Sequence, residues 1–175
     1  MKRMRSLAAA AALLFVATAT HAQVTATTSV ALNVTQASVI SISASTPTVT
    51  IPSVAAGMVT SFPTFNVTTA WNQPASAGTN VQLIGYFLTT DALSGASGVI
   101  PTSRVIGAIG ANTPAPFTGT FSGYSNAVQF FTQTLASAPN STRTDAMSIG
   151  LDYTTGATPT AGSYTGTLNL VLLVQ

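Results

Sequence analysis

The chain has 175 residues, with five lysines and arginines, three acidic residues, one histidine and no cysteine. A length of this order suits one domain with a hydrophobic core of its own. Because charged residues make up only 5% of the chain, it has too few basic side chains to bind nucleic acid or an anionic membrane surface. The absence of cysteine excludes disulfides and lipid attachment through a thiol.

The first residues predict a secretory signal peptide over residues 1–22. Three basic residues within the first five positions precede an apolar run from Leu7 to Ala19. This run is too short to span a bilayer, and Thr20-His21-Ala22 presents small residues where a signal peptidase cleaves. We therefore expect cleavage between Ala22 and Gln23. The mature domain, residues 23–175, is then secreted to the periplasm, the cell surface or the extracellular space, with no membrane insertion after cleavage.

Removal of the signal peptide leaves a nearly uncharged domain. Its charged residues are Arg104, Arg143, Asp91, Asp145 and Asp152, which give a net charge of −1. No histidine, lysine, glutamate or cysteine remains, so the usual general bases, activated nucleophiles and transition-metal ligands are missing. We therefore expect no enzymatic activity, no cofactor and no metal site.

The two arginines have different surroundings in the sequence. Arg143 and Asp145 are two positions apart and would share one face of a strand, which predicts a local ion pair. Arg104 has no acidic residue nearby in the chain, so it either pairs with a distant aspartate or lies at a solvated edge.

The mature chain opens with an alternating strand that we interpret as a candidate assembly strand. Its apolar residues on one register are Val24, Ala26, Val30, Leu32 and Val34. Edge strands are usually protected by lysine, by other charges or by proline, and this segment has none of them. It is therefore suited to pair with the sheet of another subunit, and pairing within its own domain is the alternative.

The middle of the chain contains further short runs with the alternation of strands. They cover residues 39–42, 65–71, 81–89, 104–109, 117–121, 126–134 and 147–153. The run at 81–89 is apolar on both registers, as in a central core strand. Residues 75–80, 91–98 and 155–162 are rich in small and turn-forming residues and predict loops. Seven to nine short strands without helical periodicity predict an all-β fold, a single antiparallel β-sandwich of immunoglobulin-like or pilin-like type.

The last strand is expected within residues 162–175. Its alternating apolar residues are Tyr164, Leu168, Leu170, Leu172 and Val174, and Val171 and Leu173 make the other face apolar too. A strand that is apolar on both faces is typical of a buried position in a sheet. We therefore expect this strand in the centre of the sandwich, beside the strand at 147–153.

Trp71 is the candidate for a glycan-binding platform. Carbohydrate-binding modules built on β-sandwiches present exposed aromatic rings, and Trp71 closes a predicted strand next to a loop. Packing in the core or at its rim is the alternative, because most aromatic residues of sandwiches pack inside.

Two parts of the chain resemble bacterial surface domains of the pilin and spore-coat type. They are the leader strand at 23–35 and the ending Ala161-Gly162-Ser163-Tyr164-Thr165-Gly166, which is followed by an alternating strand. The resemblance implies an immunoglobulin-like sandwich that is often completed by a strand from the next subunit. Tyr164 and Gly166 match the turn-to-strand elements of that ending. The chain departs from many such pilins because it has no cysteine and no aromatic residue close to its last position, which leaves dependence on a dedicated chaperone and usher open.

These features predict a secreted or cell-surface protein with a structural or adhesive role. The leading hypothesis is a fimbria-like fibre subunit, as in a pilus, that assembles by β-strand addition. The alternative is an extracellular carbohydrate-binding module. The expected partners are other copies of the chain, other surface proteins or a glycan.

Overall fold

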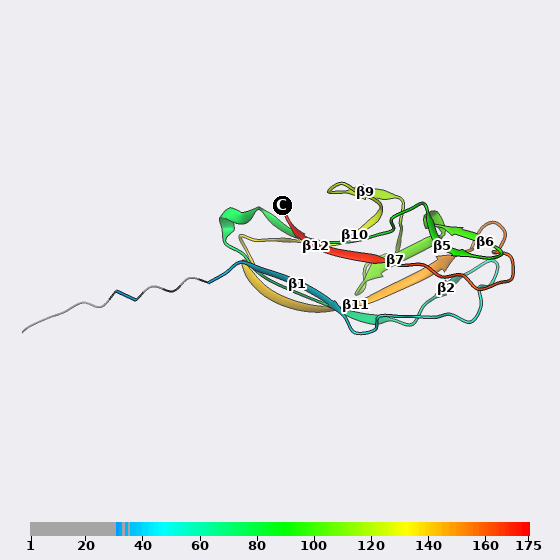
Figure 1. Cartoon of the computed structure of the whole chain (residues 1–175), viewed down its shortest axis with the longest axis horizontal. Coiled ribbons are helices and arrows are strands. Elements are labelled where there is room, and N and C mark those ends of the chain that lie inside the picture. Colours follow the sequence, from blue (N-terminus) through cyan, green and yellow to red (C-terminus); the bar gives the residue numbers. More distant parts are fainter. Residues whose placement is uncertain (1–30, 33, 35) are drawn as a thin grey trace, which may run out of the picture. The chain divides into compact units, whose positions relative to one another are not determined.

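The computed structural model describes residues 31, 32, 34 and 36–175 (Figure 1). The chain divides into two units, residues 1–35 and residues 36–175. The predicted signal peptide lies outside the described residues, and the three described residues of the first unit lie in no strand. Among the described residues, no helix has the length and hydropathy required to cross a membrane.

The first sheet of the second unit, sheet A, is antiparallel and has the strand order β1-β3-β11-β7-β8, with β2 also paired to β11. Its strands are β1 (Val39–Ala44), β2 (Val59–Ser61), β3 (Phe65–Asn72), β7 (Val105–Ile109), β8 (Ala115–Pro116) and β11 (Asn140–Asp152). The long strand β11 lies in the middle, because β3 and β2 pair with one of its edges and β7 with the other.

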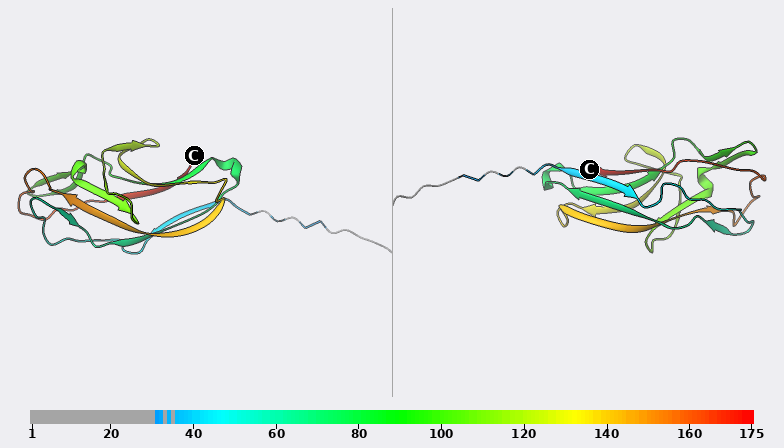
Figure 2. Two further views of the ribbon diagram at one scale, coloured as in Figure 1. Left: turned by 180° about the vertical axis from the view of Figure 1, so that it is seen from behind. Right: turned by 60° about the horizontal axis from the view of Figure 1, so that its bottom comes forward.

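The second sheet, sheet B, has the strand order β12-β4-β10-β9. Its strands are β4 (Asn80–Tyr86), β9 (Gly119–Phe121), β10 (Tyr124–Thr134) and β12 (Asn169–Val174). A separate hairpin joins β5 (Asp91–Gly95) to β6 (Gly98–Pro101), and two short 3-10 helices, η1 (Ala75–Ala77) and η2 (Thr102–Arg104), lie in connections. Both views in Figure 2 show the two sheets as two layers.

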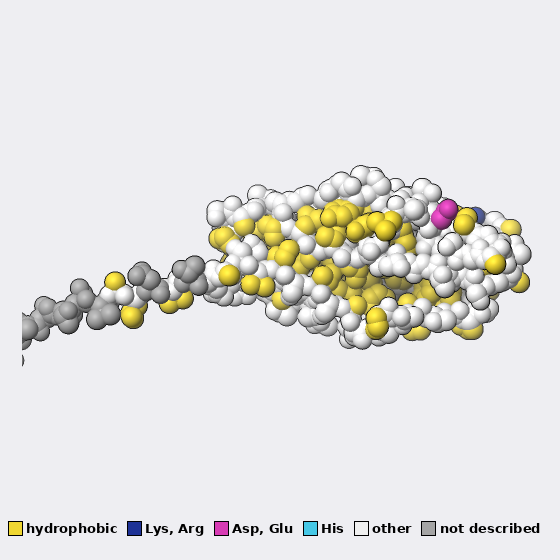
Figure 3. All heavy atoms as spheres, viewed as in Figure 1, with side chains coloured by type: hydrophobic (Ala, Val, Ile, Leu, Met, Phe, Trp, Pro, Cys, Tyr) yellow, Lys and Arg dark blue, Asp and Glu magenta, His cyan; other side chains and the backbone are white. Residues whose placement is uncertain are grey.

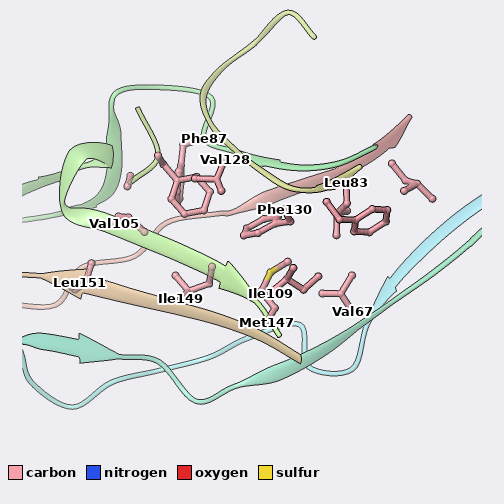
Figure 4. Close-up of a cluster of buried hydrophobic side chains, with 14 of the residues drawn as sticks. Val67, Leu83, Phe87, Val105, Ile109, Val128, Phe130, Met147, Ile149 and Leu151 are labelled. Atoms are coloured by element: carbon pink, nitrogen blue, oxygen red, sulfur yellow. The ribbon is translucent and has the colours of Figure 1, made fainter. Parts of the chain in front are cut away.

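The hydrophobic core lies between the two sheets. Figure 4 shows Leu83 and Phe130 of sheet B on one side of it and Val67, Met147 and Ile149 of sheet A on the other, and all five side chains are buried. Val67, Leu83, Met147 and Ile149 lie on the inward registers of their strands. Phe130 lies where the register of β10 against β4 shifts. The all-β antiparallel sandwich predicted from the sequence is confirmed.

Most predicted strands are present, with different bounds. β1, β3, β4, β7, β9, β10 and β11 overlap the predicted runs, and β4 is central in sheet B as expected. The prediction of a loop at residues 91–98 was wrong, because β5 and the start of β6 lie there. The short strand β2 lies where the sequence predicts no strand.

The predicted position of the last strand was also wrong. β12 begins only at Asn169, and it is the edge strand of sheet B, paired with β4 and not with β11. Its outward-facing Val171 lies opposite Ile84, which is fully buried although it points away from the core. The apolar second face of β12 therefore lies beside a covered part of the outer surface of sheet B, while Val171 itself is only partly buried, and it does not indicate a central position.

The ending that resembles pilin-type domains packs on the β5–β6 hairpin before β12 begins. Thr165 and Ser94 exchange two backbone hydrogen bonds of 2.8 and 2.9 Å. A Cβ at Gly166 would lie 2.0 Å from the carbonyl oxygen of Ala92. Only glycine permits this approach of two backbones, so Gly166 is required where the segment crosses β5.

Candidate functional site: the β1–β12 flank

The candidate site is the flank of the sandwich where the two edge strands β1 and β12 lie near each other, which we call the β1–β12 flank. β1 is the edge of sheet A and β12 the edge of sheet B. They approach each other closely, but each is hydrogen-bonded only to its own sheet. The right-hand view of Figure 2 shows β1 in cyan beside β12 in red. Among the described residues, no strand bridges the two sheets here.

Backbone groups of β12 point into this flank. Gln175 and Asn80 exchange two hydrogen bonds, of 2.9 and 2.8 Å. Hydrogen-bonded and non-hydrogen-bonded pairs alternate along an antiparallel ladder. The N–H and C=O groups of Leu170, Leu172 and Val174 therefore point away from β4, toward the flank.

The same alternation applies to β1. The N–H of Ser45 donates to the carbonyl oxygen of Asn66 at 2.8 Å, which makes these two residues a hydrogen-bonded position of the β1–β3 ladder. Counting back by two from Ser45, the hydrogen-bonded positions are Ser43, Ser41 and Val39. The backbone groups of Ile40 and Ile42, which lie between them, therefore point away from β3. Both edges of the flank thus present unpaired main-chain donors and acceptors to one another.

The side chains of these same residues face the core. Ile40 and Ile42 lie opposite Trp71 and Thr69, which are buried, and Leu172 lies opposite buried Leu83. Nevertheless, Ile40 is 45% exposed. An apolar side chain that points inward and is still exposed indicates that the sandwich is incompletely closed at this flank.

Figure 3 shows the result at the surface. Apolar side chains gather along β12 and in the hollow between β12 and β1. All residues of β12 except Leu172 are only partly buried. No lysine, arginine or acidic residue lies on either strand, so neither edge has the charges that usually prevent pairing with another chain.

The opposite flank of the sandwich also has a partly open edge. β11 pairs with β7 only through Met147–Leu151, so in the described structure residues 140–145 have no strand on that side. Arg143 lies here and faces the core, because it is opposite buried Thr69 of β3. The guanidinium carbon of Arg143 lies 4.2 Å from the centre of the Phe131 ring.

The predicted ion pair between Arg143 and Asp145 is present at this opposite flank. Nε and Nη2 of Arg143 donate to the two carboxylate oxygens of Asp145 at 2.5 and 2.7 Å. The side chains remain 33% and 18% exposed. Inward-pointing charges are a known way to prevent edge-to-edge pairing. The two flanks therefore differ, because one is protected by charge and the β1–β12 flank is not.

Trp71 does not form an exposed platform. It is 2% exposed, its Nε1 donates to the carbonyl oxygen of Ala138 at 2.8 Å, and its ring lies 6.2 Å from that of Phe131. Its inward position on β3 turns the ring into the core. The ring therefore presents no face to a glycan, and Trp71 takes the packing role that was the alternative.

The residues of the candidate assembly strand lie in the first unit of the chain. Val24, Ala26 and Val30 are outside the described residues. Leu32 and Val34 are described, and neither lies in a strand. Pairing by this segment therefore stays a prediction.

The carboxylates are spread over the molecule. Asp91 begins β5, while Asp145 and Asp152 lie on opposite faces of β11, seven positions apart. Among the described residues, no group of three or more acidic, histidine or cysteine side chains is placed to hold a metal ion. The structure does not bring these carboxylates together.

Arg104 and Asp152 stabilise the end of β11. Nη1 of Arg104 donates to the carbonyl oxygens of Asp152 and Thr155 at 3.3 and 2.7 Å, so the arginine pairs with backbone and not with a carboxylate. The carboxylate of Asp152 accepts hydrogen bonds from the hydroxyl and the N–H of Thr154 at 2.6 and 2.9 Å. These bonds, with a smaller contribution from the charge of Arg104, lower the pKa of Asp152.

The chain matches no protein-family model, no curated protein and no solved structure.

Proposed function

We propose that the protein is a structural subunit of a secreted or cell-surface assembly, and that the β1–β12 flank of one copy accepts a β-strand from the next. The observation that carries the proposal is the pair of unprotected apolar edges, β1 and β12, whose inward side chains remain partly exposed. A strand added here would pair with the free backbone groups of both edges and cover the apolar side chains.

The occupant that fits this flank is the segment 24–34 of a second copy. It has no charge and no proline, and all its apolar residues except the small Ala31 lie on a single register. In strand addition, main-chain hydrogen bonds supply affinity, and alternate side chains that enter the core determine the register. An alternating segment is therefore complementary to a flank with apolar side chains inside and free backbone groups at its edges.

Two neighbouring residues of β1 provide a matched test. Ile40 is 45% exposed and faces inward, while Val39 is 51% exposed and faces outward. A lysine at position 40 would place a charge inside the flank, whereas a lysine at position 39 would extend into solvent. We expect the mature protein and the Val39→Lys variant to form polymers, and the Ile40→Lys variant to remain monomeric. Size-exclusion chromatography with light scattering and negative-stain electron microscopy measure this difference.

A second matched pair tests the segment without altering the flank. Leu32 lies on the apolar register of the segment and Asn33 on the polar register. We expect Leu32→Asp to abolish polymerisation and Asn33→Asp to permit it. A mixture of Ile40→Lys and Leu32→Asp proteins should then form dimers only, because one variant retains the segment and the other retains the flank.

Either of two results would refute the assembly. One is a mature protein that stays monomeric at all concentrations. The other is polymerisation of the Ile40→Lys variant to the same extent as the Val39→Lys variant. Circular dichroism of both lysine variants controls for loss of the fold, and the segment variants keep the test decisive if position 40 does not tolerate lysine.

A further inference from the structure

A pocket on sheet B lies outside the β1–β12 flank. It has a volume of about 220 Å³ and is formed where the end of β4 meets the turn between β9 and β10. None of its lining residues belongs to β1 or β12. Its function is therefore separable from strand addition.

Two tyrosines form one wall of the pocket. The rings of Tyr86 and Tyr124 have their centres 4.6 Å apart and are tilted by 46°. Both side chains are half-buried, and the neighbouring Leu88 is 80% exposed. The pocket is an open depression that combines aromatic faces with an exposed apolar side chain.

The backbone at this site has an uncommon conformation. In the described structure, Ser122 and Asn126 are the two residues other than glycine with positive φ, 52° and 51°. They lie on either side of Tyr124, and the carbonyl oxygen of Asn126 accepts a hydrogen bond from the N–H of Phe87 at 3.1 Å. This conformation holds Asn126 at the pocket, where its amide can donate and accept.

A second polar group nearby lacks a partner. Asn169 lies directly opposite Tyr86 on the same face of sheet B, and its Nδ2 is buried without a hydrogen-bond acceptor. Buried amide donors normally have a partner, since leaving one unpaired destabilises the fold. This donor lies beside Tyr86 but outside the pocket lining, so it marks an incompletely paired region of sheet B and supplies no ligand contact.

The lining determines the class of ligand. No charged residue lines the pocket, so it offers nothing to neutralise an ionic group. A pyranose ring has C–H groups on its faces, which pack on aromatic rings, and hydroxyls at its edge, which pair with amides and hydroxyls. The volume lies below the roughly 300–1,000 Å³ of drug-sized sites, which suits one sugar ring.

We propose that this pocket binds a single neutral pyranose unit of a surface glycan, with Tyr86 and Tyr124 as the aromatic wall and Asn126 as the polar contact. The protein would then carry a glycan site on sheet B in addition to its assembly flank. This site takes the place of the one expected at Trp71.

The probes are methyl glycosides of glucose, galactose, mannose and N-acetylglucosamine, titrated into the Leu32→Asp variant, which is expected to stay monomeric, and followed by NMR. We expect at least one of them to shift the ring signals of Tyr86 and Tyr124 saturably. Asn126→Gly removes the amide and keeps the backbone conformation, because glycine adopts positive φ without strain. It should weaken binding by about tenfold. Tyr164→Phe alters a tyrosine outside the pocket and should leave binding unchanged.

Three results would overturn the proposal. They are no saturable shift for any probe up to about 100 mM, equal binding by the Asn126→Gly variant, and equal binding of a methyl glucuronide, which is charged. The Ile40→Lys protein should bind the glycoside as the unaltered protein does, so failure of the assembly and failure of the glycan site are distinguishable.

Discussion

Replacement of Gly166 by alanine tests how the segment before β12 is positioned. A Cβ at this residue would lie 2.0 Å from the carbonyl oxygen of Ala92 and 3.2 Å from the Cα of Leu93. Both neighbours are backbone atoms of β5, which cannot move aside as a flexible side chain does. We place the overpacking cost at about 3 kcal/mol, the upper end of the usual range. Loss of unfolded-state entropy offsets about 0.4–1 kcal/mol of it, which leaves a net loss of about 2 kcal/mol.

The assay is equilibrium unfolding in urea. With a slope of about 2 kcal/mol per molar urea, the Gly166→Ala variant should unfold at a midpoint about 1 M lower than the unaltered protein. Gly162→Ala is the matched control in the same segment. Its new Cβ would meet the side chain of exposed Ser97, whose hydroxyl can rotate away and whose Cβ, at 3.0 Å, needs only a small shift. Its stability should change by less than about 0.5 kcal/mol. Equal stability of the Gly166→Ala and unaltered proteins, or equal losses in both variants, would contradict the contact between this segment and β5.

Two further predictions concern the charged residues of β11. Thr154→Val removes the hydroxyl that donates to Asp152, so the pKa of Asp152 should rise toward its ordinary value of 3.8 in an NMR titration. Because the folded pKa is lowered, the stabilisation is present above the unfolded pKa and is lost as pH falls through the folded pKa. The variant should lose part of this pH dependence, since the backbone N–H of residue 154 still donates to Asp152. Asp145→Ala leaves Arg143 unpaired above Phe131, and we expect a loss of about 1 kcal/mol in urea unfolding, since both charges are partly solvated. An unchanged titration of Asp152, or unchanged stability of the second variant, would contradict the respective interaction.

The strands with one apolar register could be predicted from the sequence because period-2 alternation directly reports a buried face. β3 is the clearest case, since Val67, Thr69 and Trp71 are all buried on its inner face. β5 and β6 could not be predicted in this way. Their pairing depends on a hairpin with glycines at Gly95 and Gly98, which the sequence pattern indicates as a loop.

The candidate site was less accessible to prediction. Alternation shows which side chains of β1 and β12 point inward, but it does not show that both strands are edges or that they lie side by side. The apolar second face of β12 indicated a central strand, whereas its outer face lies beside fully buried Ile84. The pair of Tyr86 and Tyr124 joins two strands that are far apart in the chain, so no local pattern could indicate it.

The ion pair of Arg143 and Asp145 has a consequence for the form of an assembly. It protects one flank of the sandwich, so under the proposed function each subunit has one acceptor surface and one donor segment. Such a subunit makes two contacts, one through its donor segment and one through its acceptor surface. Repeated head-to-tail contacts of this kind that do not close into a ring produce an unbranched filament with two different ends. A subunit that accepted strands at both flanks would instead branch or aggregate laterally. The placement of a single ion pair would therefore determine whether the protein grows in one dimension.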